Sequence, residues 1–416
     1  MSSDRRAFLA SLGALSAAGL TVPGAWTSVA RAQGTRGKTP VVPRGLAASD
    51  DILLEPGLTY LQTGSLGPTP RPVMDRTIAV WKDLELDPTA KGYGPIETAM
   101  EDVRAKAAAF IGCDTRELVL TNSTSEGMNW VAQGISWSPG ERVLTTDQEH
   151  PGGRACWDYV ARRYGVAIDV VVIPPGENDP QAIVERFARL MTPRTRVLSF
   201  SHLLTSTGLR MPVAELSALA RRAGCLSVVD GAQAVGGIDV NVKALGCHAY
   251  ATCGHKWMLA PKGTGLLYLS DDLAGRVDPI MLQSGREAYT ASTGVCSLPS
   301  VHGMAAAIDY HNVLGKARIE AHNVALGRYL YEALKTVPKI RVVSAAPGPL
   351  ASPLLTYALP GDVPSGALHA RLHAKHRVEV KVVPANFMNG QRISTHLFNT
   401  ERDVDALIAA LKLELA

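Results

Sequence analysis

Short apolar runs alternate with helical stretches between residues 115 and 270, and this alternation restricts the possible folds more than any other feature. Several runs are apolar without interruption, which is typical of strands buried on both faces of a sheet. PVAELSALARRAG, with Pro212 near its start and Gly224 just past its end, is typical of the helical stretches between them. The alternation predicts an α/β fold with a mostly parallel sheet covered by helices. The seven expected strands are residues 117–121, 142–147, 168–174, 196–202, 226–232, 249–254 and 265–270.

The pattern changes after about residue 310. HNVALGRYLYEALKTV and SGALHARLHAKH have helical periodicity, VEVKVVP and QRISTHLF read as strands, and a last helix is expected from Glu401 onward. A chain of 416 residues, 46% hydrophobic and 19% charged, is long enough for a globular protein with two such parts. We expect an N-terminal segment and large domain over residues 33–310, and a small α+β domain over residues 311–416.

The first 32 residues resemble a twin-arginine signal peptide. Arg5 and Arg6 precede a moderately apolar stretch, and the small residues around Arg31 suit a cleavage site. An amphipathic helix or a membrane anchor is the alternative, but the stretch is too short and too weakly apolar to span a bilayer. We therefore expect export to the periplasm or another extracytoplasmic space. Cleavage would lower the formal charge from +4 to +2, too little to indicate nucleic-acid or membrane binding.

Six cysteines in an exported chain raise the question of disulfides. The twin-arginine route resembles a pathway for proteins that fold in the reducing cytoplasm, often around a cofactor. We therefore expect free and mostly buried thiols.

In a sheet of this kind the functional site lies beyond the carboxyl ends of the strands. Five polar clusters follow the expected strands, and we expect them to meet at one edge. They are TNSTSEG, QEHPGG, SHLLTSTG, DGAQ and GHKW.

Two of these clusters hold groups that need a partner. Asp230 ends an apolar run, where a buried carboxylate is costly unless it is paired, so it caps a helix, binds a metal or holds a protonated ring nitrogen. Lys256 ends the next strand, and by itself reads equally as a surface lysine. Together, a lysine able to form a Schiff base and an aspartate for a pyridinium nitrogen are what pyridoxal phosphate (PLP) needs from a protein.

A third cluster, TNSTSEG, has Glu126 in the first turn of the helix that follows it. Such a segment is suited to bind a phosphate, and it is equally typical of an ordinary helix N-cap.

SVVDGAQAVGGIDVNVKALGCHAYATCGHKWMLAPKGTGLLYL resembles the core of the class V aminotransferase family, which are fold-type I PLP enzymes. The likeness extends from YLQTGSLGPTP (60–70) to GQRISTHLFNTERDVDALI (390–408). It implies a PLP cofactor, a small amino-acid-like substrate, and a homodimer with sites at the subunit interface. Within the family, the chain looks most like isopenicillin N epimerase-like proteins.

The resemblance also implies roles for individual residues. Lys256 is similar in place to the lysine that forms the cofactor aldimine, Asp230 to the partner of the pyridine nitrogen, and His150 to the histidine stacked on the ring. Arg392 resembles the arginine that binds the substrate carboxylate. Further cofactor contacts are implied for Thr124, Ser125, Thr205, Gln233 and His255. Lys262, in APKGTG, is expected to be structural.

Three positions depart from the family pattern. Cys253 stands where a hydroxyl residue commonly helps to bind the phosphate, Val295 replaces a threonine expected to reach the neighbouring subunit's phosphate, and His248 replaces a frequent aspartate. These departures are expected to alter cofactor binding in detail.

Two groups of residues are similar in type to metal ligands. Cys247, His248, Cys253 and His255 resemble zinc ligands in type, but strand alternation separates His248 from the others. The histidines of residues 369–376 share a helical face with no carboxylate in the same run, which indicates an exposed basic helix. We therefore expect no metal.

The reaction is left open among transamination, epimerisation and a β- or C–S lyase step. A cysteine desulfurase is disfavoured because no cysteine follows Cys296, whereas desulfurases resemble one another in a catalytic cysteine shortly before the position of Arg392. A dinucleotide oxidoreductase lacks its G-x-G-x-x-G turn in the sheet region. A non-catalytic binding protein on the same fold stays as a further alternative.

Overall fold

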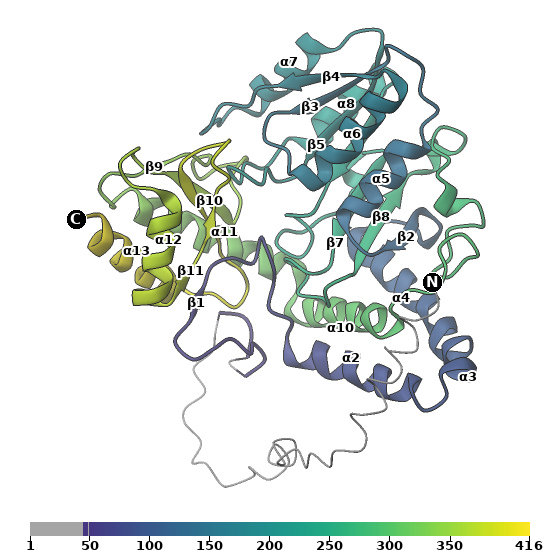
Figure 1. Ribbon diagram of the computed structural model, residues 1–416, viewed down its shortest axis with the longest axis horizontal. Helices are drawn as coiled ribbons and strands as arrows, with labels where there is room; N and C mark the ends of the chain where they lie inside the picture. The colour runs from purple at the N-terminus through teal and green to yellow at the C-terminus, as the bar shows by residue number, and fades with distance from the viewer. Residues whose placement is uncertain (1–44, 49) are drawn as a thin grey trace, which may run out of the picture. The chain divides into compact units, whose positions relative to one another are not determined.

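The computed structural model describes residues 45–48 and 50–416, which all belong to one compact unit (Figure 1). The expected signal peptide, residues 1–32, lies outside the described residues. No helix in the described part of the chain combines the length and the apolar character needed to cross a membrane.

A seven-stranded sheet forms the centre of the larger part, in the order β2-β8-β7-β6-β5-β3-β4. Only β8 runs antiparallel to its neighbours, so the expected mostly parallel sheet is confirmed. All seven strands predicted from the sequence are present, with ends that differ by a few residues. Their bounds are β2 Leu118–Thr121, β3 Arg142–Thr146, β4 Ala167–Val171, β5 Thr195–Ser201, β6 Leu226–Asp230, β7 Ala249–Cys253 and β8 Gly265–Leu269.

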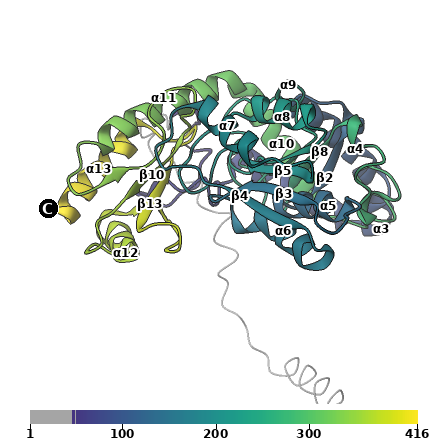
Figure 2. The same cartoon turned by 90° about the horizontal axis from the view of Figure 1, so that it is seen from above.

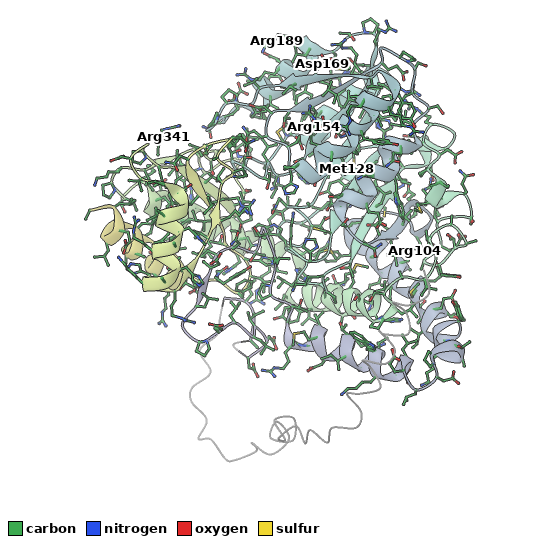
Figure 3. All side chains as sticks on the ribbon, viewed as in Figure 1. Arg104, Met128, Arg154, Asp169, Arg189 and Arg341 are labelled. Atoms are coloured by element: carbon green, nitrogen blue, oxygen red, sulfur yellow. The ribbon has the colours of Figure 1, made fainter. Side chains whose placement is uncertain are left out.

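Alternate residues of these strands face two separate hydrophobic clusters. Val197 and Val228 pack with Met128 of α5 and Trp157 of α6, whereas Leu198 belongs to the cluster on the other face, with residues of α4, α7, α8 and α10. Figure 2 shows α5 and α6 below the strands and α7 and α8 above them, and Figure 3 labels Met128 on α5. Both faces are therefore buried, which explains the continuous apolar runs.

The helices of this part begin at capping or proline residues that the sequence makes visible. Pro88, Pro151 and Pro180 each stand at a first helical position, where the missing N–H has no helical partner to lose. The helices are α2 Arg71–Leu84, α3 Pro88–Gly92, α4 Pro95–Ile111, α5 Thr124–Gly134, α6 Pro151–Tyr164, α7 Pro180–Leu190, α8 Val213–Arg222, α9 Val242–Leu245 and α10 Leu298–Leu314.

A second, four-stranded antiparallel sheet follows, in the order β12-β13-β10-β9. Its buried strand β10 was missed: a Pro/Ala-rich loop was expected there, because its apolar residues lie between Pro353 and Pro360. The short strand β9 was missed as well, and VEVKVVP, expected as one strand, forms two short strands that belong to different sheets, β11 and β12. The expected helices and the strand at QRISTHLF are present. The elements are α11 Lys316–Leu334, β9 Arg341–Val342, β10 Leu354–Ala358, α12 Ser365–His376, β11 Val378–Glu379, β12 Lys381–Val382, β13 Gly390–Ser394 and α13 Glu401–Leu415.

The first described residues pack with the last part of the chain. β1 (Thr59–Tyr60) pairs in parallel with β11, and the Gln62 side chain donates to Glu379. Leu61 belongs to the hydrophobic cluster of α11, α12 and α13. The domain division near residue 310 stays a prediction, with the added observation that this early segment joins the later sheet.

The six cysteines all lie in the described residues and are free. Four are buried and two are half-buried, which confirms the expectation of unpaired thiols.

Candidate active site

A cavity of about 460 Å³ lies at the carboxyl ends of the central strands. All five polar clusters singled out in the sequence contribute to its wall, as the parallel arrangement of the strands requires. The N-terminal segment and the second sheet complete the wall. Its lining residues from the five clusters include Ser123, Thr124, Ser125, Glu149, His150, Thr205, Asp230, Gln233, His255 and Lys256.

Lys256 lies in the loop after β7, and its neighbour Trp257 fixes that loop. The indole Nε1 of Trp257 donates to Gln233 Oε1 at 2.9 Å, and the Trp257 carbonyl oxygen accepts from His396 Nε2 at 2.7 Å. Leu259, buried three residues after the lysine, has φ of 55°, a conformation that costs about 1 kcal/mol for a side chain other than glycine. The loop is thus held in one conformation around Lys256.

The segment around Gly67 packs directly against this loop. The Gly67 N–H donates to the His255 carbonyl oxygen at 2.8 Å, and a Cβ at Gly67 would lie 2.1 Å from the Lys256 carbonyl oxygen. Lys262 Nζ donates to the Gly67 carbonyl oxygen at 3.0 Å and to Thr69 Oγ1 at 3.1 Å. Lys262 therefore holds the segment in place, in keeping with its expected structural role.

Asp230 is 5% exposed and ends β6, beside the strand that leads to Lys256. Its Oδ1 accepts from the Ala232 N–H at 2.9 Å. A Cβ at Gly153, in the first turn of α6, would lie 2.4 Å from Oδ2, so glycine is needed for this close approach. Among the described residues no cation pairs with Asp230, and a buried carboxylate without one requires a positive partner in the cavity.

The N-termini of α5 and α6 meet at the same wall. Ser123 caps α5 by accepting from the Glu126 N–H at 3.1 Å, which leaves the first N–H groups of the helix free. The buried Oγ1 of Thr124 has no hydrogen-bond partner among the described residues. A Cβ at Gly152 would approach Ser125 Oγ to 2.6 Å. Free amides, a free hydroxyl and a glycine at helix N-termini form a cradle for an anion such as phosphate.

His255 and Cys253 border this cradle. Burial, together with the charges of Lys256 and Lys262, lowers the pKa of His255 to about 4, so the ring is neutral near pH 7. The thiol of Cys253 is buried and lies 3.9 Å from the Ala232 carbonyl oxygen, and burial raises its pKa. Cys253 is therefore a weak donor where the family commonly has a hydroxyl.

His150 and Gln233 also line the cavity. His150 caps α6, and its Nδ1 accepts from the Gly152 N–H at 3.0 Å, which leaves the proton on Nε2. Burial and the charge of Lys256 lower the pKa of His150, so its ring is neutral near pH 7. Gln233 Nε2 donates to the Gly64 carbonyl oxygen at 2.8 Å and keeps a second N–H for a ligand.

Arg392 reaches the cavity from β13 and is only 5% exposed. Its Nη1 donates to the carbonyl oxygen and Oγ1 of Thr205 at 3.1 and 2.9 Å, and its Nη2 donates to Ser65 Oγ at 3.2 Å. The buried Nε has no partner, no described carboxylate pairs with the guanidinium, and burial lowers its pKa to about 10. A buried guanidinium that has no acidic partner and an unused N–H group binds a carboxylate favourably. Thr205 thus contacts Arg392, and the cofactor contact that the resemblance implies for Thr205 stays a prediction.

Three charged residues of the cavity, Asp147, Glu149 and Lys381, were missed in the sequence. Glu149 was visible beside His150 in QEHPGG but received no role, and it accepts from Ser201 Oγ and Thr146 Oγ1, each at 2.6 Å. Burial raises its pKa to about 7. Lys381, on β12, could be recognised only once its strand was known to pair with β13.

The positions weighed as metal sites have other partners. His248 Nδ1 accepts from the Ser227 N–H at 3.0 Å, and His248 precedes β7, at the end of that strand opposite the cavity. Glu379 and Glu414, which the sequence run did not contain, accept from the helical histidines of residues 369–376. The expected exposed basic helix is therefore partly neutralised by carboxylates from other elements. Among the described residues no group of His, Cys, Asp or Glu side chains is arranged to hold a metal ion.

Val295, the third departure from the family pattern, is 59% exposed and does not line the cavity.

The sequence profile of the family described as aminotransferase class-V matches residues 59–407. The chain belongs to the class V aminotransferase family. It is 32% identical over 387 residues to isopenicillin N epimerase of Amycolatopsis lactamdurans, which covers 88% of this chain and 97% of that protein. It is 30% identical over 309 residues to a probable cysteine desulfurase of Methanothermobacter thermautotrophicus, which covers 70% of this chain and 76% of that protein.

Solved structures of the family share the fold. The cystine C–S lyase C-DES, in complex with its reaction product cysteine persulfide, superposes with a TM-score of 0.78 at 25% identity, and covers 86% of this chain and 98% of that one. The apo cysteine desulfurase of Thermococcus onnurineus has a TM-score of 0.76 at 24% identity, with 88% and 96% covered. These similarities confirm the fold-type I architecture.

The cofactor of this class V enzyme is PLP, and the cavity fits it. The cradle at Thr124 and Ser125 suits the phosphate, the unpaired carboxylate of Asp230 suits the ring nitrogen, and Lys256 stands in the same cavity as the amine.

Proposed function

We propose that this PLP-dependent class V enzyme acts at the α-carbon of an amino acid or an amino-acid-derived substrate, as a transaminase or an isopenicillin N epimerase-like enzyme. The observation that carries the proposal is Arg392, a buried guanidinium without an acidic partner among the described residues, in one cavity with Lys256 and Asp230. A carboxylate bound there would place the adjacent α-carbon inside the cavity.

The residues divide the chemistry between them. When bound, PLP supplies an electron sink for negative charge at the substrate α-carbon. Asp230 Oδ2 would hold the proton of the ring nitrogen by its charge, and His150 would cover one face of the ring. Thr124, Ser125 and His255 would donate to the phosphate. Lys256 Nζ would take the α-proton and return it, and the place of its return separates transamination from epimerisation.

A C–S or β-lyase reaction is the second candidate, because the relatives include cysteine desulfurases and the structural neighbours include a cystine C–S lyase. A desulfurase is the less favoured form, since Arg392 has no cysteine in the ninety or so residues before it, after Cys296. A lyase would use the same proton transfer by Lys256, followed by loss of a group from the β-carbon.

An absorbance spectrum of the purified protein tests cofactor binding. The parent should show a visible band that is lost or shifted in Lys256→Ala and retained in Lys412→Ala, a control on the exposed side of α13. A parent that stays colourless with added PLP would favour a non-catalytic binding protein.

Exchange of the α-proton in heavy water, followed by nuclear magnetic resonance across an amino-acid panel, tests the reaction. Exchange that yields the other enantiomer without a keto acid supports epimerisation. A requirement for a keto acid supports transamination, and release of the β-substituent supports the lyase. Absence of all three in a protein that binds PLP would refute the proposal.

We also propose that residues 1–32 direct export by the twin-arginine pathway, and that the enzyme is a homodimer. The paired Arg5 and Arg6 support the first, and the class V family supports the second. Light scattering of the purified protein measures the oligomeric state.

A further inference from the structure

Two cations stand opposite each other on the second sheet and both line the cavity. Lys381 of β12 is the direct antiparallel partner of Arg392 of β13. Side chains of residues paired in this way project from the same face of a sheet and lie close together. Like charges in this arrangement are destabilising when nothing stands between them.

No acidic side chain of the described residues forms an ion pair with either cation. Ion pairs occur elsewhere in the chain, such as Arg142 with Asp169. The carboxylates that line the cavity accept hydrogen bonds from other groups: Glu149 from the Ser201 hydroxyl, Asp147 from the Ile173 N–H and Asp230 from the Ala232 N–H. The cavity wall formed by β12 and β13 is therefore positively charged.

The two cations occupy different depths. Arg392 is buried and held by Thr205 and Ser65, whereas Lys381 is exposed. The loop after β12 also lines the cavity, through residues that include Asn386 and Phe387. A ligand whose first carboxylate binds Arg392 would pass Lys381 as it extends toward solvent.

We propose that Lys381 binds a second anionic group of the substrate, so that the preferred substrates carry a carboxylate distal to the α-carbon. This inference rests on the proposed function only in that Arg392 takes the α-carboxylate. Asn386 and Phe387, on the loop after β12, also line the cavity and would contact the same part of the ligand.

Unreactive ligands test this preference separately from catalysis. Titration calorimetry on the PLP-loaded enzyme would compare glutarate with glutaramate, which has the same length but a neutral amide at one end. Glutarate should bind about two- to fivefold more tightly, the range expected for one exposed ion pair. The preference should shrink as salt is added, because exposed charges are screened.

Variants assign the preference to one residue. Lys381→Met should abolish the advantage of glutarate while the affinity for glutaramate stays unchanged, and Lys381→Arg should restore it. Lys412→Met, an exposed lysine on α13, is the matched control and should keep the parent's preference.

Three results would overturn the proposal: equal affinities for the two ligands in the parent, no measurable binding of either, or an equal loss of both in Lys381→Met. The last would mean that Lys381 serves the same carboxylate as Arg392. Failure of the proposed function looks different. A PLP-loaded protein that prefers glutarate through Lys381, but exchanges no α-proton, would refute the activity and leave the second anion site intact.

Discussion

Replacement of Glu149 by glutamine should make the stability of the protein depend less on pH. In the cavity wall, Glu149 accepts hydrogen bonds from Thr146 Oγ1, Ser201 Oγ and the Ser201 N–H. A glutamine keeps the acceptor for Thr146 and the Ser201 N–H, and its amide nitrogen donates to a rotated Ser201 hydroxyl. Glu149→Gln therefore imitates the protonated acid with the packing unchanged.

The size of the effect follows from the pKa of Glu149. Burial raises it from 4.5 to about 7, and the nearby charge of Asp230 acts in the same direction. The folded protein thus holds this proton more firmly than the unfolded chain does. The stabilising contribution is complete below pH 4.5 and is lost as the pH rises to about 7. Because Glu149 is only half-buried, the loss amounts to about 1–3 kcal/mol.

Thermal unfolding of the cofactor-free parent and of Glu149→Gln, scanned between acidic and mildly alkaline pH, measures this loss. The parent should lose a few degrees of Tm relative to the variant as the pH rises from about 4.5 to about 7, with no further loss above that. Buried histidines such as His202, whose pKa is lowered to about 3, contribute with the opposite sign, but equally in both proteins. A Tm difference that stays constant across the range would refute the raised pKa of Glu149.

Three further perturbations have defined outcomes. Gly153→Ala places a methyl group against Asp230 Oδ2 and should weaken PLP binding at least tenfold in a fluorescence titration, as loss of a buried charged contact does. Unchanged affinity would show that Asp230 does not contact the cofactor. Arg392→Lys keeps the charge but loses the fixed fork, so glutaramate affinity should fall about tenfold by calorimetry; no change would place the carboxylate elsewhere. Replacement of Arg5 and Arg6 by lysine should retain the precursor in the cytoplasm, as cell fractionation would show; continued export would exclude the twin-arginine route.

The central sheet and most of the cavity could be predicted because both depend on local patterns. Each parallel strand is a short apolar run, and the polar residues after it must gather at one sheet edge. Asp230 ends β6 and Lys256 follows the adjacent strand β7, so the sequence predicted that both residues line one cavity.

The rest depends on contacts between distant segments, which leave little local signal. β10 is short and lies between prolines, and it becomes a strand because β13 and β9 pair with it on either side. The position of Lys381 in the cavity wall follows from its pairing with Arg392 on the neighbouring strand, which the sequence around Lys381 does not indicate. The bond from Arg392 to the Thr205 hydroxyl likewise joins the second sheet to the central one, and the family resemblance did not imply it.

The parallel pairing of β1 with β11 joins residues more than 300 positions apart, as the bond from Gln62 to Glu379 does. Gly64, Ser65 and Gly67 reach Gln233, Arg392 and the Lys256 loop only when that pairing exists. A nascent chain still attached to the ribosome lacks β11 until synthesis is almost finished. Assembly of the catalytic centre is therefore a late event in biogenesis, and contacts of such long range make that closing step slow.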